Sequence, residues 1–461
     1  MPEAGAEWYE GAVRVRAKLA AAVGCAALLG CSSPGAERAI RVTVMVRSPI
    51  DDVCITARDE DTTPAPTVLG FPYDASMLPT PATLTFVAGP SFTGPAEITA
   101  RGLTAGSFVG GASVTTSLAV HGTTDASLPV ERCRPRGTAG FGTRPAGTFV
   151  VLLAPPRMIA ADYDGDGRDE LLAVAEDGTL ASLDAEFVDR GSHRESSLRA
   201  PDGVLVGAGD LDRDCRLDVL TVAGSGVLVV TSPHGDSPPP VGNAPHDAAI
   251  GRVARTSPLR LIVGGTTGLA LVPPSGATGT TSMLGTMPID HVATWDMDGD
   301  GGSEIVATGT MGLVSFHAMA GAESMTTLLP AGFEMFHGPV AVGDVDDDGD
   351  VDVVVANTTA LHVARRGATS FVDASGTTAT TLDMAVVRLI VSDVDGDCAD
   401  DVIAISASGT VSAFSVKPSG GLMAIGSMAN ALDFAVGDYD GDGVREIALL
   451  GTGGRVTLWQ P

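Results

Sequence analysis

Six nonapeptides in the 461-residue chain carry carboxylates at fixed positions. Each has Asp at positions 1, 3 and 5 and Asp or Glu at position 9: DYDGDGRDE (162–170), DLDRDCRLD (210–218), DMDGDGGSE (296–304), DVDDDGDVD (344–352), DVDGDCADD (393–401) and DYDGDGVRE (438–446). In a tight loop, Asp side chains at alternate positions direct their oxygens towards one point. The position-9 carboxylate and the position-7 carbonyl complete an oxygen shell of the kind that Ca²⁺ prefers. We therefore predict about six Ca²⁺ ions.

The predicted ligands are the same five positions of each loop. They are Asp162, Asp164, Asp166, Arg168 and Glu170; Asp210, Asp212, Asp214, Arg216 and Asp218; Asp296, Asp298, Asp300, Gly302 and Glu304; Asp344, Asp346, Asp348, Asp350 and Asp352; Asp393, Asp395, Asp397, Ala399 and Asp401; and Asp438, Asp440, Asp442, Val444 and Glu446. An EF-hand closes with an acid at position 12 and is flanked by helices, so it does not fit. Zinc is disfavoured because no His or thiolate set accompanies the loops.

The loops mark a repeat that organises the chain. Their starts lie 48, 86, 48, 49 and 45 residues apart, and the double spacing hides a further repeat at 252, where Arg252, Ala254, Thr256 and Arg260 replace the four acids. We expect that repeat to carry no metal. Seven repeats of 40–50 residues built from short strands indicate a propeller or a solenoid.

Each loop is followed by an apolar, β-rich run such as ELLAVA or DVVVAN, then a turn and another strand. No stretch shows sustained helical periodicity. The last repeat ends after its third strand, so we expect GTFVVLLA (147–154) to supply the missing fourth strand and close the ring. The predicted fold is all-β, with a seven-bladed β-propeller over 147–461.

The motif D-x-D-x-D-G-x-x-D/E, repeated at this spacing before an apolar strand, resembles the FG-GAP/VCBS repeats of integrin α-subunits and of many bacterial surface proteins. The resemblance implies a calcium that braces each blade and lies away from the usual ligand face. Two loops depart from it, because Cys215 and Cys398 stand at position 6, where Gly permits positive φ. A non-Gly residue there costs about 1–2 kcal/mol, which implies a weaker site or a different turn. We expect these two cysteines not to pair with each other, since their repeats lie well apart.

The N-terminal third differs from the repeats. Basic residues precede the apolar run 19–30, which is too short to span a bilayer, so residues 1–30 are predicted to be a signal peptide. The sequence Leu-Leu-Gly-Cys resembles a bacterial lipobox, which implies lipidation of Cys31; a plain signal peptide cut nearby is the alternative. An anchor-proximal linker (31–40), a small β-sandwich (41–135) and a second linker (136–146) follow. Cys54 and Cys133 could form a disulfide in an oxidising compartment.

Composition limits the function. The formal net charge is −28 with only two Lys, which excludes binding to nucleic acid by phosphate neutralisation. No catalytic motif is present, and Asp290-His291 has no nearby nucleophile in the sequence. Trp295 and Trp459 adjoin strands, which favours packing over sugar stacking. We predict a non-enzymatic, lipid-anchored outer-membrane or cell-surface protein whose propeller binds protein or another envelope macromolecule. A glycan-binding propeller and an enzyme acting on envelope polysaccharide are the alternatives.

Overall fold

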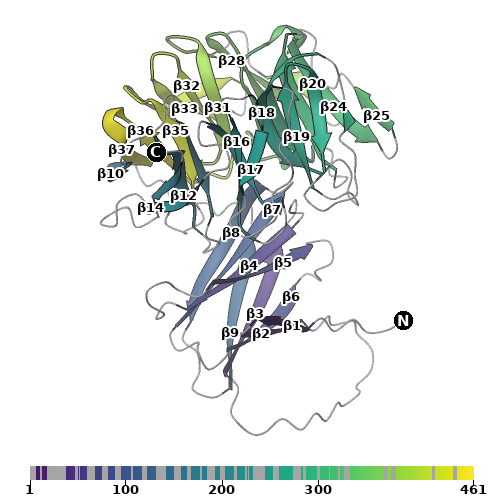
Figure 1. Cartoon of the computed structure of the whole chain (residues 1–461), viewed down its shortest axis with the longest axis vertical. Helices are drawn as coiled ribbons and strands as arrows, with labels where there is room; N and C mark the ends of the chain where they lie inside the picture. Colours follow the sequence, from purple (N-terminus) through teal and green to yellow (C-terminus); the bar gives the residue numbers. More distant parts are fainter. Residues whose placement is uncertain are drawn as a thin grey trace. The chain divides into compact units, whose positions relative to one another are not determined.

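The computed structural model divides the chain into two compact units: residues 1–103, 108–132 and 165–167 form the first, and residues 104–107, 133–164 and 168–461 the second (Figure 1). The structure describes residues 7–10, 13–17, 38–46, 50, 52–59, 68–74, 81–88, 95–104, 107–116, 122–130, 142–149, 157–163, 168–176, 179–183, 193–197, 203–211, 215–223, 226, 228–231, 244–252, 259–273, 282–283, 287–297, 302–310, 312–319, 322–325, 333–366, 371–374, 380–417, 421–439 and 444–460. Over these ranges it contains strands and two short 3-10 helices, η2 (Phe333–Met335) and η3 (Thr452–Gly454), so the all-β prediction is confirmed. No helix within them is long and apolar enough to cross a membrane.

The first unit has two sheets. One has the order β1 (Glu7–Glu10), β2 (Val13–Ala17), β6 (Ala82–Ala88), β3 (Arg38–Val46), β9 (Gly122–Val130), with β3 and β9 parallel. The other has the order β5 (Val68–Asp74), β4 (Asp52–Asp59), β7 (Ala96–Thr104), β8 (Ser107–Thr116). In β3, Val42 and Val44 are buried while Arg41 and Met45 are exposed. This alternation gives the sheet one apolar face.

Part of the predicted signal peptide belongs to this unit. Strand β2 pairs with β6, Val13 opposite Ala88 through Ala17 opposite Leu84, and β1 pairs with β2. The apolar run 19–30 and Cys31 lie outside the described residues. Alternating Val and Arg in VRVRA suit a strand with one apolar and one polar face, which is the signal that the sequence interpretation passed over.

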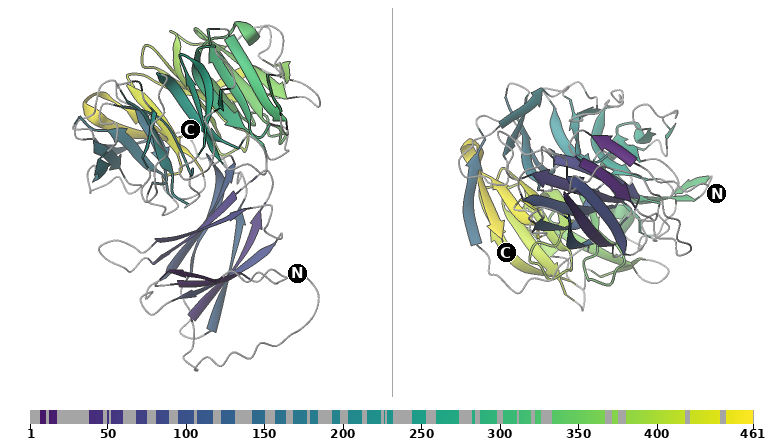
Figure 2. Two further views of the ribbon diagram at one scale, coloured as in Figure 1. Left: turned by 45° about the vertical axis from the view of Figure 1, so that its right-hand side comes forward. Right: turned by 90° about the horizontal axis from the view of Figure 1, so that it is seen from below.

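The second unit contains small antiparallel sheets that follow one another along the chain (Figures 1 and 2). In order they are β11 (Met158–Ala161), β12 (Glu170–Val174), β13 (Thr179–Leu183), β14 (His193–Ser197); β15 (Val204–Gly209), β16 (Asp218–Val222), β17 (Leu228–Thr231); β18 (Pro245–Gly251), β19 (Arg260–Gly265), β20 (Gly268–Val272), β21 (Ser282–Met283); β22 (Ile289–Trp295), β23 (Glu304–Gly309), β24 (Gly312–Met319), β25 (Ala322–Met325); β26 (Val340–Gly343), β27 (Asp352–Asn357), β28 (Ala360–Arg366), β29 (Phe371–Asp373), with β30 (Thr380–Thr381) beside β28; and β31 (Val386–Ser392), β32 (Asp401–Ser406), β33 (Val411–Val416), β34 (Leu422–Met428). The last sheet has the order β10 (Gly142–Thr148), β37 (Arg455–Gln460), β36 (Glu446–Leu450), β35 (Asp433–Gly437).

We call β11, β15, β18, β22, β26, β31 and β35 the first strands. Successive first strands from β11 to β31 contact one another, and β11 also contacts β35 of the last sheet. The second strands are buried on both faces, because each sheet packs against two others. In β27, Val353 and Val355 join the core shared with the preceding sheet, whereas Val354 and Ala356 join the core shared with the following one. The apolar runs after the loops are therefore the packing layers between sheets.

The strand that completes the last sheet begins earlier than predicted. This strand is β10 (Gly142–Thr148), which pairs with β37 and has a bulge between Pro145 and Gly147. The predicted bounds of the strand (147–154) and of the linker before it (136–146) are therefore wrong. Phe149 ends the pairing by turning into the core shared by the first and last sheets, where it is fully buried. The apolar run GTFVVLLA thus contains Phe149, the core residue that follows the strand. The strand itself lies at the edge of its sheet, where a sequence with low hydrophobicity and a proline is tolerated.

Candidate metal centres

Each of the six acidic loops joins the first strand of a sheet to its second strand. The position-9 acid is in every case the first residue of the second strand: Glu170, Asp218, Glu304, Asp352, Asp401 and Glu446. All six of these residues are buried. The apolar second strand therefore draws one carboxylate of each loop out of water.

The position-9 carboxylate also clamps the loop. In every loop one of its oxygens accepts a hydrogen bond from the backbone N–H of position 2. The donors and acceptors are Tyr163 to Glu170 (2.8 Å), Leu211 to Asp218 (2.9 Å), Met297 to Glu304 (2.7 Å), Val345 to Asp352 (3.1 Å), Val394 to Asp401 (3.1 Å) and Tyr439 to Glu446 (3.2 Å). The acid at position 9 thus has a structural role in all six loops, alongside any ligand role.

The turn at position 6 is the same with or without glycine. The N–H of position 6 donates to Oδ2 of position 1 from Cys215 to Asp210 (3.1 Å), from Gly349 to Asp344 (3.0 Å) and from Cys398 to Asp393 (3.1 Å). All three donors have positive φ, at 70°, 89° and 84°. The two cysteine loops therefore keep the turn, at a conformational cost of about 1–2 kcal/mol each.

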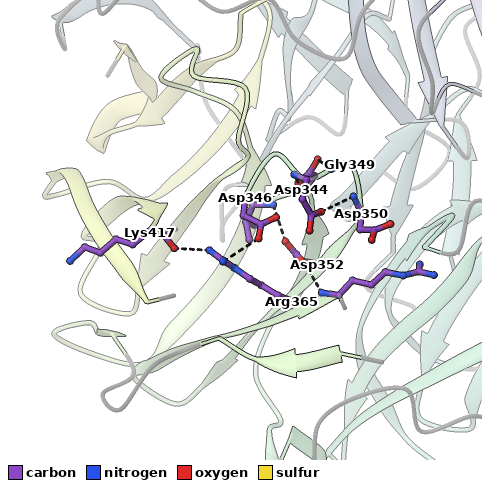
Figure 3. A network of polar contacts seen from close by, with 10 residues as sticks. Asp344, Asp346, Gly349, Asp350, Asp352, Arg365 and Lys417 are labelled. Atoms are coloured by element: carbon purple, nitrogen blue, oxygen red, sulfur yellow. Dashed lines mark hydrogen bonds and ion pairs between the residues drawn. The ribbon is translucent and has the colours of Figure 1, made fainter. Parts of the chain in front are cut away.

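Two loops, 344–352 and 393–401, are described along their whole length, and both gather carboxylates. Figure 3 shows the first of them. Ligand oxygens of Asp344, Asp346 and Asp348 lie within 4.8 Å of one another, and so do those of Asp393, Asp395 and Asp401. In the other loops the position-3 and position-5 acids lie outside the described residues: Asp164, Asp166, Asp212, Asp214, Asp298, Asp300, Asp440 and Asp442.

Without a cation, burial and repulsion between neighbouring acids make the ionised form of these carboxylates unfavourable. Burial, together with the charge of neighbouring acids, raises the pKa of Asp401 to about 9. Burial likewise raises the pKa of Asp352 to about 7 and that of Asp393 to about 6. Asp346 Oδ1 and Asp401 Oδ1 are buried and accept no hydrogen bond. Crowded, desolvated carboxylate oxygens with unused lone pairs match the donor set of a hard divalent cation.

Sequence analysis did not predict a partner for Asp346. The Arg365 guanidinium, on β28, lies 3.1 Å from Asp346 Oδ2 and also donates to the Lys417 carbonyl (2.7 Å; Figure 3). Both side chains of the ion pair are about one-sixth exposed, at 16% and 17%. One oxygen of Asp346 is therefore held by arginine, and the other, Oδ1, is the buried oxygen that accepts no hydrogen bond.

In two of the loops the residue at position 8 contacts the loop of another repeat. Asp400 N donates to Asp344 O (2.8 Å) while Asp344 N donates to Asp400 Oδ2 (2.9 Å). The same two-point contact joins Asp169 to Asp438, at 2.9 Å for both bonds. The second pair links the first repeat to the last.

Glycine before the loop is the sequence signal for this contact. A Cβ on Gly343 would lie 2.6 Å from Asp400 Oδ2, and a Cβ on Gly437 would lie 2.9 Å from Asp169 Oδ2. The same position is Gly251 in the third repeat, whose Arg252 N donates to Ser303 Oγ (3.0 Å). In that repeat Arg252 is buried, Arg260 begins β19, and Ala254 and Thr256 lie outside the described residues.

The described cysteines are oxidised. Cys54, Cys215 and Cys398 are each half of a disulfide. Cys133, the predicted partner of Cys54, lies outside the described residues, so that pairing stays a prediction. The participation of both position-6 cysteines in disulfides was not foreseen from the sequence.

The residues that the sequence analysis weighed for catalysis or sugar stacking contact neighbouring side chains. Asp290 Oδ1 lies 2.9 Å from His246 Nδ1, and His291 Nδ1 lies 3.9 Å from Asp247 Oδ2. Trp459 is buried in the core between the last two sheets, and Trp295 is half-buried against the core of β22–β28, so both pack as expected.

No protein-family model matches the chain, and no curated protein matches its sequence. Among solved structures, the chain is similar to BBS1N crystallised in complex with ARL6DN and soaked with lead (13% identity, 70% of this chain and 95% of that chain, TM-score 0.46). It is also similar to the BP39L lectin from Burkholderia pseudomallei (14% identity, 69% and 99%, TM-score 0.45) and to Saccharomyces cerevisiae Sqt1 (11%, 71% and 100%, TM-score 0.40). Such distant likeness indicates neither ligand nor activity.

Proposed function

We propose that the chain is a calcium-braced interaction module of the bacterial cell envelope, with a seven-bladed propeller following a small β-sandwich. The observation that carries the calcium assignment is the buried position-9 carboxylate that closes each of the six loops, together with the acids that gather in the two loops described in full. The pairing of β10 with β37 and the contact between Asp169 and Asp438 support a closed ring. Calcium would supply the positive charge that the clustered carboxylates lack, which is a structural role.

Calcium titration tests this proposal. Protein stripped of metal should bind close to six Ca²⁺ by calorimetry, and its melting temperature should rise with calcium, because a ligand bound only by the folded state stabilises it. Magnesium at the same concentration is the matched control, since it demands a smaller, near-octahedral site. A melting temperature indifferent to calcium would rule out the bracing role, and seven bound ions would contradict the loss of the site at Arg252.

The anchoring part of the proposal rests on Cys31. The Cys31→Ala variant should no longer incorporate labelled palmitate and should lose its membrane association in cell fractionation. A Cys25→Ala variant, which changes a cysteine in the same apolar run, should be lipidated normally. Unchanged labelling and unchanged fractionation of the Cys31→Ala protein would show that Cys31 is not the lipidated residue, whereas no labelling of the wild type would favour a plain signal peptide.

The non-enzymatic assignment is likewise a proposal. The His–Asp contacts in the described residues pair side chains with each other, and no nucleophile accompanies them there. A screen of polysaccharides and esters, with calcium and with chelator, tests the alternative. Calcium-dependent turnover would make the chain an envelope enzyme.

A further inference from the structure

A charged cluster lies at the starts of the first strands, at the ends away from the acidic loops. Its members come from five repeats: Arg157, which precedes β11; His246 and Asp247 of β18; Asp290 and His291 of β22; Arg388 of β31; and Asp433 of β35. Acidic loops follow the other ends of β11, β22, β31 and β35, and the loop that lacks the four acids follows β18. The cluster, which we call the strand-start cluster, is therefore separate from the candidate metal centres.

Most charged groups of the strand-start cluster are already satisfied. Arg388 Nη1 contacts both oxygens of Asp433 (2.9 and 2.8 Å) and donates to the carbonyls of Met158 (3.0 Å) and Phe434 (2.6 Å). Asp433 Oδ2 also accepts from Met158 N (2.7 Å). This buried pair ties β31 to β35 and β11, which is a structural role.

The aspartates on β18 and β22 also have hydrogen-bond partners. Asp247 accepts from the N–H groups of Ala248 and Val292, both at 3.0 Å, and Asp290 is bonded to His246. The imidazoles of His246 and His291 thus meet carboxylates through Nδ1, which leaves each Nε2 for another partner. Burial lowers the pKa of His291 to about 4, so its ring is neutral at physiological pH.

Arg157 is different. Its side chain is half-buried near Asp433, Asp247 and Arg388, but it makes no hydrogen bond and no ion pair within 4.0 Å in the part of the chain that the structure describes. A guanidinium presents five N–H donors in a planar fork that matches a carboxylate. A desolvated fork without acceptors is unfavourable, and a carboxylate ligand would satisfy it.

Exposed apolar side chains surround the same end of the first strands. Met335 and Met384 precede β26 and β31, Val387 is the second residue of β31, and Leu432 immediately precedes β35; all four are exposed, Met335 by 66%. The other large exposed apolar side chains of the described residues lie on outer strands of the sheets or in the first unit: Met45, Met283, Val372 and Met423. A small hydrophilic acid would leave this apolar rim in water, and a polyanion would be repelled by the net charge of −28.

We propose that the strand-start cluster binds a peptide segment of a partner protein that carries one carboxylate flanked by apolar side chains. The carboxylate pairs with Arg157, and the apolar side chains cover Met335, Met384, Val387 and Leu432. This inference deepens the proposed interaction function and rests on it. It assigns the face opposite the acidic loops as the binding face.

Selection from a displayed random-peptide library on the full-length, calcium-loaded protein tests the inference. Enriched peptides should carry Asp, Glu or a free C-terminus next to apolar residues. A synthetic peptide from the selection should bind Arg157→Gln about 10- to 100-fold more weakly than wild type, the loss expected for a charged hydrogen bond. Changing its carboxylate to the amide should cost wild type the same factor and Arg157→Gln little.

Two further variants make the result specific. Leu432→Ser should weaken binding without changing the requirement for a carboxylate, whereas Arg455→Gln, which changes an exposed arginine on β37, should bind as wild type does. Calcium-dependent melting of each variant shows that it is folded and tests the calcium proposal separately. Peptides indifferent to Arg157, no enrichment over the Arg157→Gln protein, or tight binding of succinate or inorganic phosphate alone would overturn the inference.

Discussion

Each position-9 acid is buried and is also a potential metal ligand. Without metal these two roles conflict, because burial disfavours the charge that a ligand needs. Asp401 must be buried to begin the apolar strand β32 and to clamp the N–H of Val394, yet its second oxygen is left without a hydrogen bond among other acids. The clamp needs only one acceptor oxygen, which an amide also provides. The negative charge is useful only when a cation is present.

Asp401→Asn should therefore change stability in opposite directions with and without calcium. In chelator at pH 8 the free energy of unfolding of the variant should be higher by on the order of 1–3 kcal/mol, because the wild type must take up a proton at Asp401 or bury its charge on folding, whereas Asn keeps the clamp and needs neither. In excess calcium it should be less stable than wild type, because a ligand is lost. Denaturant melts under both conditions measure the two differences.

Asp347→Asn is the matched control for this test. It removes one charge from an acidic loop at position 4, where the side chain is exposed and the backbone has φ 58°, a conformation that Asn tolerates well. Its effect should be small in both media. A shift of the same sign for Asp401→Asn in chelator and in calcium would contradict the assignment of Asp401 as a metal ligand.

At the level of the strands, the repeat in the sequence was sufficient to place most elements. Period and phase located the second strands, because each starts at an acid that the motif defines. The interactions between repeats were not predictable in this way. Asp400 and Arg365 act on partners 56 and 19 residues away, and no local pattern encodes those pairings, although Gly343 marks one of them.

The strand that completes the last sheet was also misplaced by sequence reasoning. The apolar run 147–154 attracted the prediction, but an edge strand with one neighbour needs little hydrophobicity, and Pro145 is tolerated at a bulge. The residue of that run with a structural role in the core is Phe149, whose N–H bonds the Gly454 carbonyl (2.9 Å). Register here depends on β37, which is more than 300 residues away in the chain.

Replacing residues 142–148 with a Gly/Ser sequence of equal length tests the role of β10. The last sheet should then lose its outer strand and expose β37, so the calcium-loaded protein should melt several degrees lower and be cleaved faster near its C-terminus. The same replacement of residues 135–141 is the control and should leave melting almost unchanged. Equal effects of the two replacements would show that pairing with β10 does not stabilise the sheet.

Across the whole molecule, half of the acidic residues sit in the six loops, so its response to pH depends on whether they hold metal. In metal-free protein the folded-state pKa values of Asp393, Asp352 and Asp401 are about 6, 7 and 9, all above the ordinary value of 3.8. Between pH 4 and these values the folded state binds more protons than the unfolded state. Its free energy of unfolding therefore falls as pH rises through this window.

Melting of calcium-depleted protein should accordingly shift to lower temperature from about pH 5.5 to about pH 9. In millimolar calcium the same range should show a flat or rising profile, because metal binds the ionised carboxylates and competes with protons. The double variant Asp352→Asn/Asp401→Asn should reduce the slope of the depleted protein, because it removes two strongly shifted carboxyl groups, with pKa values of about 7 and about 9. Parallel profiles with and without calcium would show that these acids do not bind the ion, and a slope unchanged in the double variant would place the titrating groups elsewhere.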